Sequence, residues 1–289
     1  MKIRLTPIAL LLLAFGAGAV HAACITEAQA LDMADKYMAK QPIAAPEVAS
    51  EQDAACGRAK INVILEQRLG APVGYKAGLT NPAVQKRFGA DQPVWGKMYK
   101  TVLIPSGSEV DAGFGTRPLF EADMLVRVKD AGINHATTPM EVLEHIDQII
   151  PFIELPDLLV DNPAKLNGNA LSLLNVGSRA GIAGTPIAVP ATRAERYQMV
   201  DALANMNVVL ADDSGPVLGR GKGSDILGHP LNAVIWLAQS LAKENMAMKP
   251  GEVISLGSFS PLVPPKAGLK ASATYEGLPG AQPVSVRFR

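Results

Sequence analysis

The chain has 289 residues, 48% hydrophobic and 19% charged, a composition typical of a globular protein rather than a disordered or fibrous one. Its 27 basic residues equal its 27 acidic residues, so no positive excess points to nucleic acid or to an anionic membrane surface. The length suits one large domain or two modest ones.

Residues 1–22 have the pattern of a secretory signal peptide. Lys2 and Arg4 give a basic start, an apolar run follows from residue 8 to residue 20, and a V-x-A stop favours cleavage after Ala22. The apolar run is shorter than the about 20 residues that span a bilayer, which argues against a membrane anchor. We therefore expect a periplasmic or secreted protein with no membrane attachment after signal cleavage.

The expected mature chain has two cysteines, Cys24 and Cys56, in a compartment that permits disulfides. A lipid anchor on Cys24 is less favoured, because His21 stands where lipoprotein signals have leucine. Helical patterns at 26–39 and 51–69 predict a hairpin within residues 23–72, which a Cys24–Cys56 bridge would staple. Two free buried thiols are the alternative, since neither cysteine lies in a reactive motif.

From residue 73 to residue 289, short apolar runs broken by Gly and Pro predict a β-rich body with a few helices. We expect strands at 72–80, 119–129 and 152–155. A capping box at Thr138 predicts a helix that ends at Pro151. The segment 228–245 predicts an amphipathic helix, and the tail beyond it reads as strands and turns.

Common catalytic motifs are missing from the sequence. There is no H-E-x-x-H motif, Cys/His cluster or G-x-S-x-G motif, which argues against a usual zinc site and an α/β-hydrolase. The glycine-rich segment 215–225 matches neither a phosphate loop nor a dinucleotide fingerprint.

Two carboxylates, Glu121 and Asp123, stand one residue apart in an otherwise apolar strand pattern. Residues i and i+2 of a strand share a face and lie about 6.6 Å apart, so their charges repel unless a cation or donors intervene. Glu154 lies on the next predicted strand and could join them. Three carboxylates without sulfur or imidazole suit Mg²⁺ or Mn²⁺. Spacing alone, however, favours a solvated strand face.

A lysine and an aspartate complete the candidate residues. Lys76 shares its predicted strand face with Gly74 and Gly78, which leaves the backbone bare for something to approach the amine. A surface lysine in a glycine-weakened strand is the alternative. Asp91, in the segment GADQP, could be a partner for Lys76 or could simply make a turn.

Five blocks together resemble the 2-keto-4-pentenoate hydratase group of the fumarylacetoacetate hydrolase superfamily. They are GYKAGLTNPAVQKRFGADQPVWG, RPLFEADM, PFIELPD, GRGKGSDILGHPLNAVIWLA and GSFSPLVPPKAG, within residues 73–288. The resemblance implies an α+β fold, a β-rich roll with a mixed sheet (fumarylacetoacetate hydrolase C-terminal-like) over 73–289, and a homo-oligomer. It also implies metal ligands at Glu121, Asp123 and Glu154, with Lys76 and Asp91 as catalytic residues.

The resemblance further implies that a 2-oxo acid chelates Mg²⁺ or Mn²⁺ and that the ion stabilises the enolate. Lys76 would stabilise the enolate oxygen or move a proton, and Asp91 would orient Lys76 or a water. The expected reaction is hydration of a 2-hydroxy-2,4-dienoate to a 4-hydroxy-2-oxo acid. Decarboxylation of a vinylogous 2-oxo diacid is the alternative enzyme, and an exported, non-catalytic binder of metal or oxo acid is the alternative from another class.

Two features depart from the group's pattern. Leu171 stands where related hydratases often have the serine of a D-N-A-S segment, although Ser172 follows at once. The signal peptide is also unusual for a group that mostly serves cytoplasmic breakdown of aromatic compounds. Hydrolysis of an acylpyruvate is disfavoured, because His135 is the only candidate for a water-activating histidine near the metal strand and a poor one.

Overall fold

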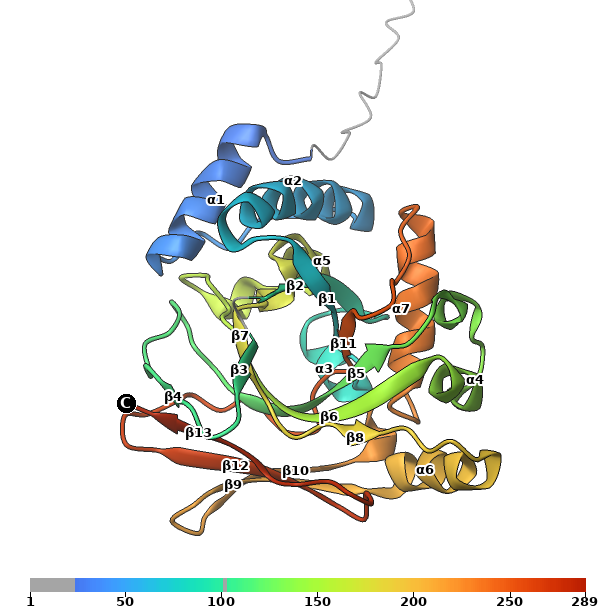
Figure 1. Ribbon diagram of the computed structural model, residues 1–289. Helices are drawn as coiled ribbons and strands as arrows, with labels where there is room; N and C mark the ends of the chain where they lie inside the picture. The colour runs from blue at the N-terminus through green and yellow to red at the C-terminus, as the bar shows by residue number, and fades with distance from the viewer. Residues whose placement is uncertain (1–23, 101–102) are drawn as a thin grey trace, which may run out of the picture.

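The structure, a computed structural model, describes residues 24–100 and 103–289 (Figure 1). The predicted signal peptide, residues 1–22, lies outside the described residues. No helix within the described ranges combines the length and the apolar character needed to cross a membrane.

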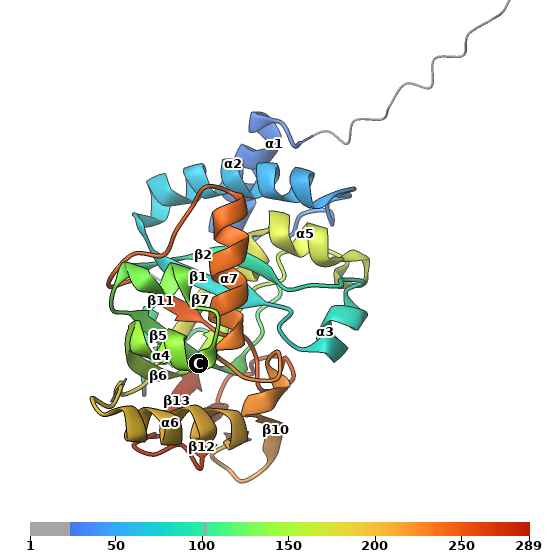
Figure 2. The same cartoon turned by 90° about the vertical axis from the view of Figure 1, so that its right-hand side faces the viewer.

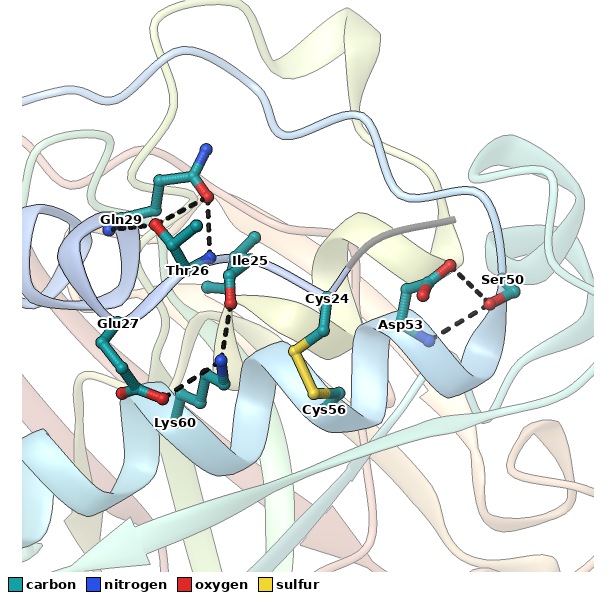
Figure 3. The surroundings of a disulfide bond; sticks show 9 residues. All are labelled: Cys24, Ile25, Thr26, Glu27, Gln29, Ser50, Asp53, Cys56 and Lys60. Carbon is teal, nitrogen blue, oxygen red and sulfur yellow. Dashed lines mark hydrogen bonds and ion pairs between the residues drawn. A yellow bond between two sulfur atoms is a disulfide. The ribbon is translucent and has the colours of Figure 1, made fainter. Parts of the chain in front are cut away.

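The predicted helical hairpin is present as α1 (Glu27–Ala39) and α2 (Glu51–Leu69). Thr26 and Gln29 form a capping box at the start of α1. A disulfide joins Cys24, ahead of α1, to Cys56 within α2, with a Cα–Cα distance of 5.7 Å (Figure 3). The predicted bridge therefore ties the start of the described chain to the second helix.

Within the described residues, the first sheet has eight strands in the order β2-β1-β11-β5-β6-β7-β3, with β8 beside β6. Their bounds are β1 (Pro72–Gly78), β2 (Val94–Tyr99), β3 (Leu103–Pro105), β5 (Glu121–Val128), β6 (Ile146–Leu155), β7 (Ala180–Ala183), β8 (Ile187–Ala188) and β11 (Val253–Ser255). The sheet is mixed, because β1 pairs parallel with β11 but antiparallel with β2.

The second sheet, as far as the structure describes the chain, has five strands in the order β10-β9-β12-β13-β4. Their bounds are β4 (Glu109–Val110), β9 (Asn207–Asp212), β10 (Val217–Lys222), β12 (Lys270–Glu276) and β13 (Val284–Phe288). Figure 1 shows this sheet on the side of the molecule opposite α1 and α2, with the first sheet curling between them.

Five further helices complete the described fold: α3 (Pro82–Arg87), α4 (Pro139–Glu144), α5 (Gly168–Leu173), α6 (Arg193–Asn205) and α7 (Asn232–Lys243). Figure 2 shows α7 running along the first sheet and α6 beside the second. The predicted amphipathic helix at 228–245 corresponds to α7, which buries Val234, Leu237 and Leu241.

The predicted helix end at Pro151 is wrong. The capping box at Thr138 is present, but α4 ends at Glu144, and β6 begins at Ile146 and runs through Pro151 to Leu155. β6 pairs with β5 along nearly its whole length and buries Ile149 completely. β-Branched side chains fit this pleated, buried surface, so pairing with β5 overrides the short helical signal.

The two larger of three apolar clusters in the described chain hold the layers together. The larger one lies between the two sheets and under α7, with Phe120, Met124 and Phe288 among its fully buried members. The second joins the helical hairpin to α5 through residues such as Leu65 and Leu173. The hairpin thus packs directly on the β-rich body, while the predicted division at residues 72 and 73 stays a prediction.

Candidate functional site

The three candidate carboxylates lie on the paired strands β5 and β6. Glu121 is the register partner of Glu154, and Asp123 is two residues further along the same face of β5. Asp123 is fully buried and Glu154 is only 4% exposed. The opposite face of β5 carries Ala122 and Met124, both buried in the main core. The predicted same-face pair therefore exists, with Asp123 buried and Glu121 half-buried, so it is not a fully solvated strand face.

Asp123 is fixed by donors that the sequence interpretation did not identify. Its Oδ2 accepts a hydrogen bond of 2.6 Å from Ser255 Oγ, and its Oδ1 accepts one of 3.1 Å from the backbone N–H of Gly257. Ser255 ends β11, the strand between β1 and β5. The only sequence signal for Ser255 is a lone hydroxyl in the apolar run VISL.

Lys76 meets the carboxylates from β1. Its ammonium forms an ion pair with Glu154 and donates a hydrogen bond of 3.0 Å to the carbonyl oxygen of Val176. In register, Lys76 lies opposite Ser255, so β1, β11, β5 and β6 present their polar side chains on one face. Four of the five predicted site residues, Lys76 and the three carboxylates, are thus brought together.

The carboxylates form a crowded, poorly solvated group whose charged form is disfavoured. The pKa of Asp123 is raised to about 8, mainly by burial and secondly by the charge of Glu154. Burial, and again the charge of Glu154, hold the pKa of Glu121 well above its usual range, although Lys76 opposes this effect. Charges that repel one another in a dry site favour a bound cation.

The donor set fits a hard divalent cation in chemistry and charge, because all three side chains offer carboxylate oxygens. Over residues 24–100 and 103–289, however, no three His, Cys, Asp or Glu side chains are already arranged to hold a metal ion. Glu154 faces Lys76, and both oxygens of Asp123 accept hydrogen bonds from the protein. Coordination through Oε1 of Glu154, the oxygen that pairs with Lys76, would require this carboxylate to exchange the lysine for the ion.

Asp91 is exposed in the loop between α3 and β2. It lines a cavity of about 770 Å³ together with residues of α2, α5 and α7, among them Arg58, Ser172 and Trp236. The polar contacts described for Lys76 are with Glu154 and Val176 and do not include Asp91. A direct orienting bond from Asp91 to Lys76 is therefore absent from this structure, and a catalytic role for Asp91 stays a prediction.

The segment with the leucine departure packs against the helical hairpin. Leu171 is buried in the apolar cluster under α1 and α2, and the hydroxyl of Ser172 accepts a hydrogen bond from Arg58 of α2. Both side chains are thus engaged in packing α5 on the hairpin. His135 is exposed at the end of a short 3-10 turn that begins at Ala131.

Comparison of sequences finds relatives over most of the chain, although no family model matches it. The protein 2-keto-4-pentenoate hydratase 2 of Dechloromonas aromatica is 29% identical over 206 residues, 71% of this chain and 75% of that protein. The 4-oxalocrotonate decarboxylase of Pseudomonas putida is 29% identical over 223 residues, 77% of this chain and 80% of that protein.

Comparison of structures covers more of the chain. The 4-oxalocrotonate decarboxylase from Pseudomonas putida G7, complexed with magnesium and adipate, superposes with a TM-score of 0.77 and 26% identity. That match covers 92% of this chain and 99% of the other. The fumarylpyruvate hydrolase from Pseudomonas aeruginosa, in complex with Mn²⁺ and pyruvate, has a TM-score of 0.52 at 15% identity, which is a likeness of fold. The predicted fold, including its helical N-terminal segment, is confirmed.

Proposed function

We propose that this chain, a homologue of 2-keto-4-pentenoate hydratases and 4-oxalocrotonate decarboxylases, is a divalent-metal-dependent lyase acting on a small 2-oxo acid. The observation that carries the proposal is the convergence of Lys76, Glu121, Asp123 and Glu154 on one buried face of the first sheet. The homologous decarboxylase was solved with magnesium and, separately, with calcium, which supports a divalent cation in this chain. Mg²⁺ or Mn²⁺ is the cofactor we propose.

The proposed reaction is the addition of water to a 2-hydroxy-2,4-dienoate, giving a 4-hydroxy-2-oxo acid. A cation held by the three carboxylates would supply positive charge for the substrate's carboxylate and 2-oxygen. Lys76, at the edge of this group, would hold or move the proton at the 2-oxygen. Ser255 and the Gly257 N–H keep Asp123 in place while substrate binds.

Decarboxylation of a vinylogous 2-oxo diacid is the second candidate, and the extent of the matches favours it. The decarboxylase relative aligns over 77% of this chain, against 71% for the hydratase relative. Both reactions build negative charge on the 2-oxygen, so Lys76 and the carboxylates would serve either one. The products differ by water gained or carbon dioxide lost.

The test follows the ultraviolet absorbance of a 2-hydroxydienoate incubated with the protein and Mg²⁺, and then measures product mass. Wild-type protein should remove the absorbance, and Lys76→Ala and Glu121→Ala should not. Glu109→Ala is the matched control, since Glu109 is an exposed carboxylate on β4. A gain in mass of one water would indicate hydration. Unchanged turnover in both site variants would show that the site is wrong, and metal binding without turnover of either a 2-hydroxydienoate or a vinylogous 2-oxo diacid would favour a non-catalytic binder.

We also propose that the enzyme works outside the cytoplasm as a homo-oligomer. The signal-peptide pattern of residues 1–22 and the Cys24–Cys56 disulfide support export. Mass spectrometry of the protein purified after expression with its own N-terminus should find a chain that begins at Ala23. A chain that retains Lys2 and Arg4 would contradict export by cleavage. Light scattering would establish the oligomer size.

A further inference from the structure

The bare backbone around Lys76 is occupied by another part of the same chain. Gly78 lies two residues beyond Lys76 on β1, and Gly96 is the register partner of Lys76 on β2. A side chain at Gly78 would collide with the side chain of Val176, and one at Gly96 would collide with the carbonyl of Asn175. The glycines beside Lys76 therefore admit a turn of the protein.

This turn has an unusual backbone. Asn175, Val176 and Gly177 all have positive φ angles, of 54°, 54° and 62°. Left-handed conformations are unfavourable for non-glycine residues and most of all for a β-branched one such as Val176. Such strain persists only where surrounding contacts impose it.

The side chain of Asn175 supplies those contacts. Its Oδ1 accepts a hydrogen bond of 2.7 Å from the backbone N–H of Lys97, and its Nδ2 donates one of 2.9 Å to the Lys97 carbonyl. The amide thus takes the place of a neighbouring strand at Lys97 on β2 and clamps the turn to the sheet. Asn175 is itself only 2% exposed.

The clamped turn ends in a contact with Lys76. The Val176 carbonyl accepts a hydrogen bond of 3.0 Å from Lys76 Nζ, whose other acceptor is Glu154. If Glu154 turned to a cation, Val176 would be the acceptor that remains.

We propose that Asn175 is a positioning residue, which fixes the Val176 carbonyl as the constant anchor of Lys76 whether Glu154 faces the lysine or a metal ion. The inference rests on the proposed function for the role of Lys76. The anchor itself is a property of the fold and is open to measurement without turnover.

The experiment compares Asn175→Ala with Asn134→Ala. Asn134 makes the same pair of bonds, from its Oδ1 and Nδ2 to the N–H and carbonyl of Met248, at 2.9 Å each. Asn134 lies in another turn, and its substitution by alanine removes equivalent hydrogen bonds. Asn175→Asp is the conservative variant, because it retains an acceptor for the Lys97 N–H.

The first readout needs no substrate. With ¹³C at the lysine ε-carbons, and the Lys76 signal assigned by its loss in Lys76→Met, spectra are recorded before and after Mg²⁺ is added. We expect a single sharp Lys76 signal in wild type and Asn134→Ala in both states. In Asn175→Ala the signal should broaden or split once Mg²⁺ binds, with partial recovery in Asn175→Asp.

The second readout is turnover. Asn175→Ala should lower kcat about 10- to 100-fold with little change in KM, as expected when a reacting group is misplaced. Asn134→Ala should keep the wild-type kcat. An unchanged Lys76 signal and kcat in Asn175→Ala would overturn the inference. If the wild-type protein shows no turnover, that result would count against the proposed function. The NMR spectra would still test whether the Val176 carbonyl anchors Lys76. If Asn175→Ala fails to fold, both measurements are made on Asn175→Asp instead. The inference is then supported if Asn175→Asp changes the Lys76 signal and lowers kcat while Asn134→Ala changes neither.

Discussion

Lys76 and Glu154 form an ion pair in which the two side chains are only 5% and 6% exposed. Glu121 lies opposite Glu154 in register, and Asp123 is its neighbour on β5, so one lysine faces three carboxylates. Lys76 therefore lies where it would compete with a bound cation for Glu154.

Removal of this lysine should separate metal binding from catalysis. In Lys76→Met the carboxylates lose their positive neighbour, and we expect Mn²⁺ affinity to rise about tenfold or more because a like charge is gone. Turnover should fall about 10²- to 10⁴-fold, as for loss of a proton-transfer group. Isothermal titration with Mn²⁺ measures the first effect. Lys97→Met is the control, since the Lys97 ammonium pairs with Glu66 of α2 and not with the site carboxylates. Weaker Mn²⁺ binding in Lys76→Met would contradict the competition.

Ser255 should tune the metal site through Asp123. Ser255→Ala removes the 2.6 Å hydrogen bond to Oδ2, and loss of such a supporting bond should weaken Mg²⁺ binding about tenfold. Ser272→Ala is the matched control, because its hydroxyl bonds the exposed Asp213 at 3.0 Å. Calorimetric titration compares the two variants. Equal affinity in both would mean that Ser255 does not support the ligand.

Local pattern was enough to predict the shared face of Glu121 and Asp123, because side chains alternate along any strand. It was enough for α1 and α2 as well, since capping and helical spacing are local signals. The end of α4 could not be predicted locally, because β6 begins at Ile146 through pairing with β5. The metal-site assignment itself came from resemblance to a family, and it stays a prediction.

The residues that support Asp123 and Lys76 could not be predicted from the sequence. Ser255 lies 132 positions from Asp123, and Val176 lies 100 positions from Lys76. No periodicity reports contacts over such separations, which depend on strand order. Gly74 and Gly78 beside Lys76 correctly indicated a close approach, but what approaches them is the backbone of Val253 on β11 at Gly74 and the side chain of Val176 at Gly78.

The stability of the metal-free protein should fall as pH rises from about 4 to about 8. Burial, followed by the charge of Glu154, raises the pKa of Asp123 from 3.8 in the unfolded chain to about 8. Between these values the folded state keeps a proton that the unfolded state releases, so the stabilisation present at low pH is lost. The slope is at most about 1.4 kcal/mol per pH unit for each such proton.

Urea unfolding in the presence of a chelator, at pH 5, 6, 7 and 8, measures this loss. Asp123→Asn should flatten the pH dependence, because the amide has no proton to release. Added Mg²⁺ should restore the free energy of unfolding that the wild-type protein loses at pH 8. The same addition should stabilise Asp123→Asn less. A metal-free stability that rises across this range would show that these carboxylates fold in the charged form.

The Cys24–Cys56 disulfide should contribute to the stability of the hairpin and, through it, of the whole fold. It closes a loop over a separation of 32 residues, for which chain entropy gives about 3 to 4 kcal/mol. Replacement of both cysteines by serine should lower the free energy of unfolding by that amount. The same loss should follow reduction of the wild type by dithiothreitol, whereas the double-serine variant should not respond to the reductant.

Since α2 packs on α5 through Arg58 and Ser172, the unfolding transition should stay single and shift as a whole. A separate early transition for the hairpin would show that residues 24–69 unfold independently of the body.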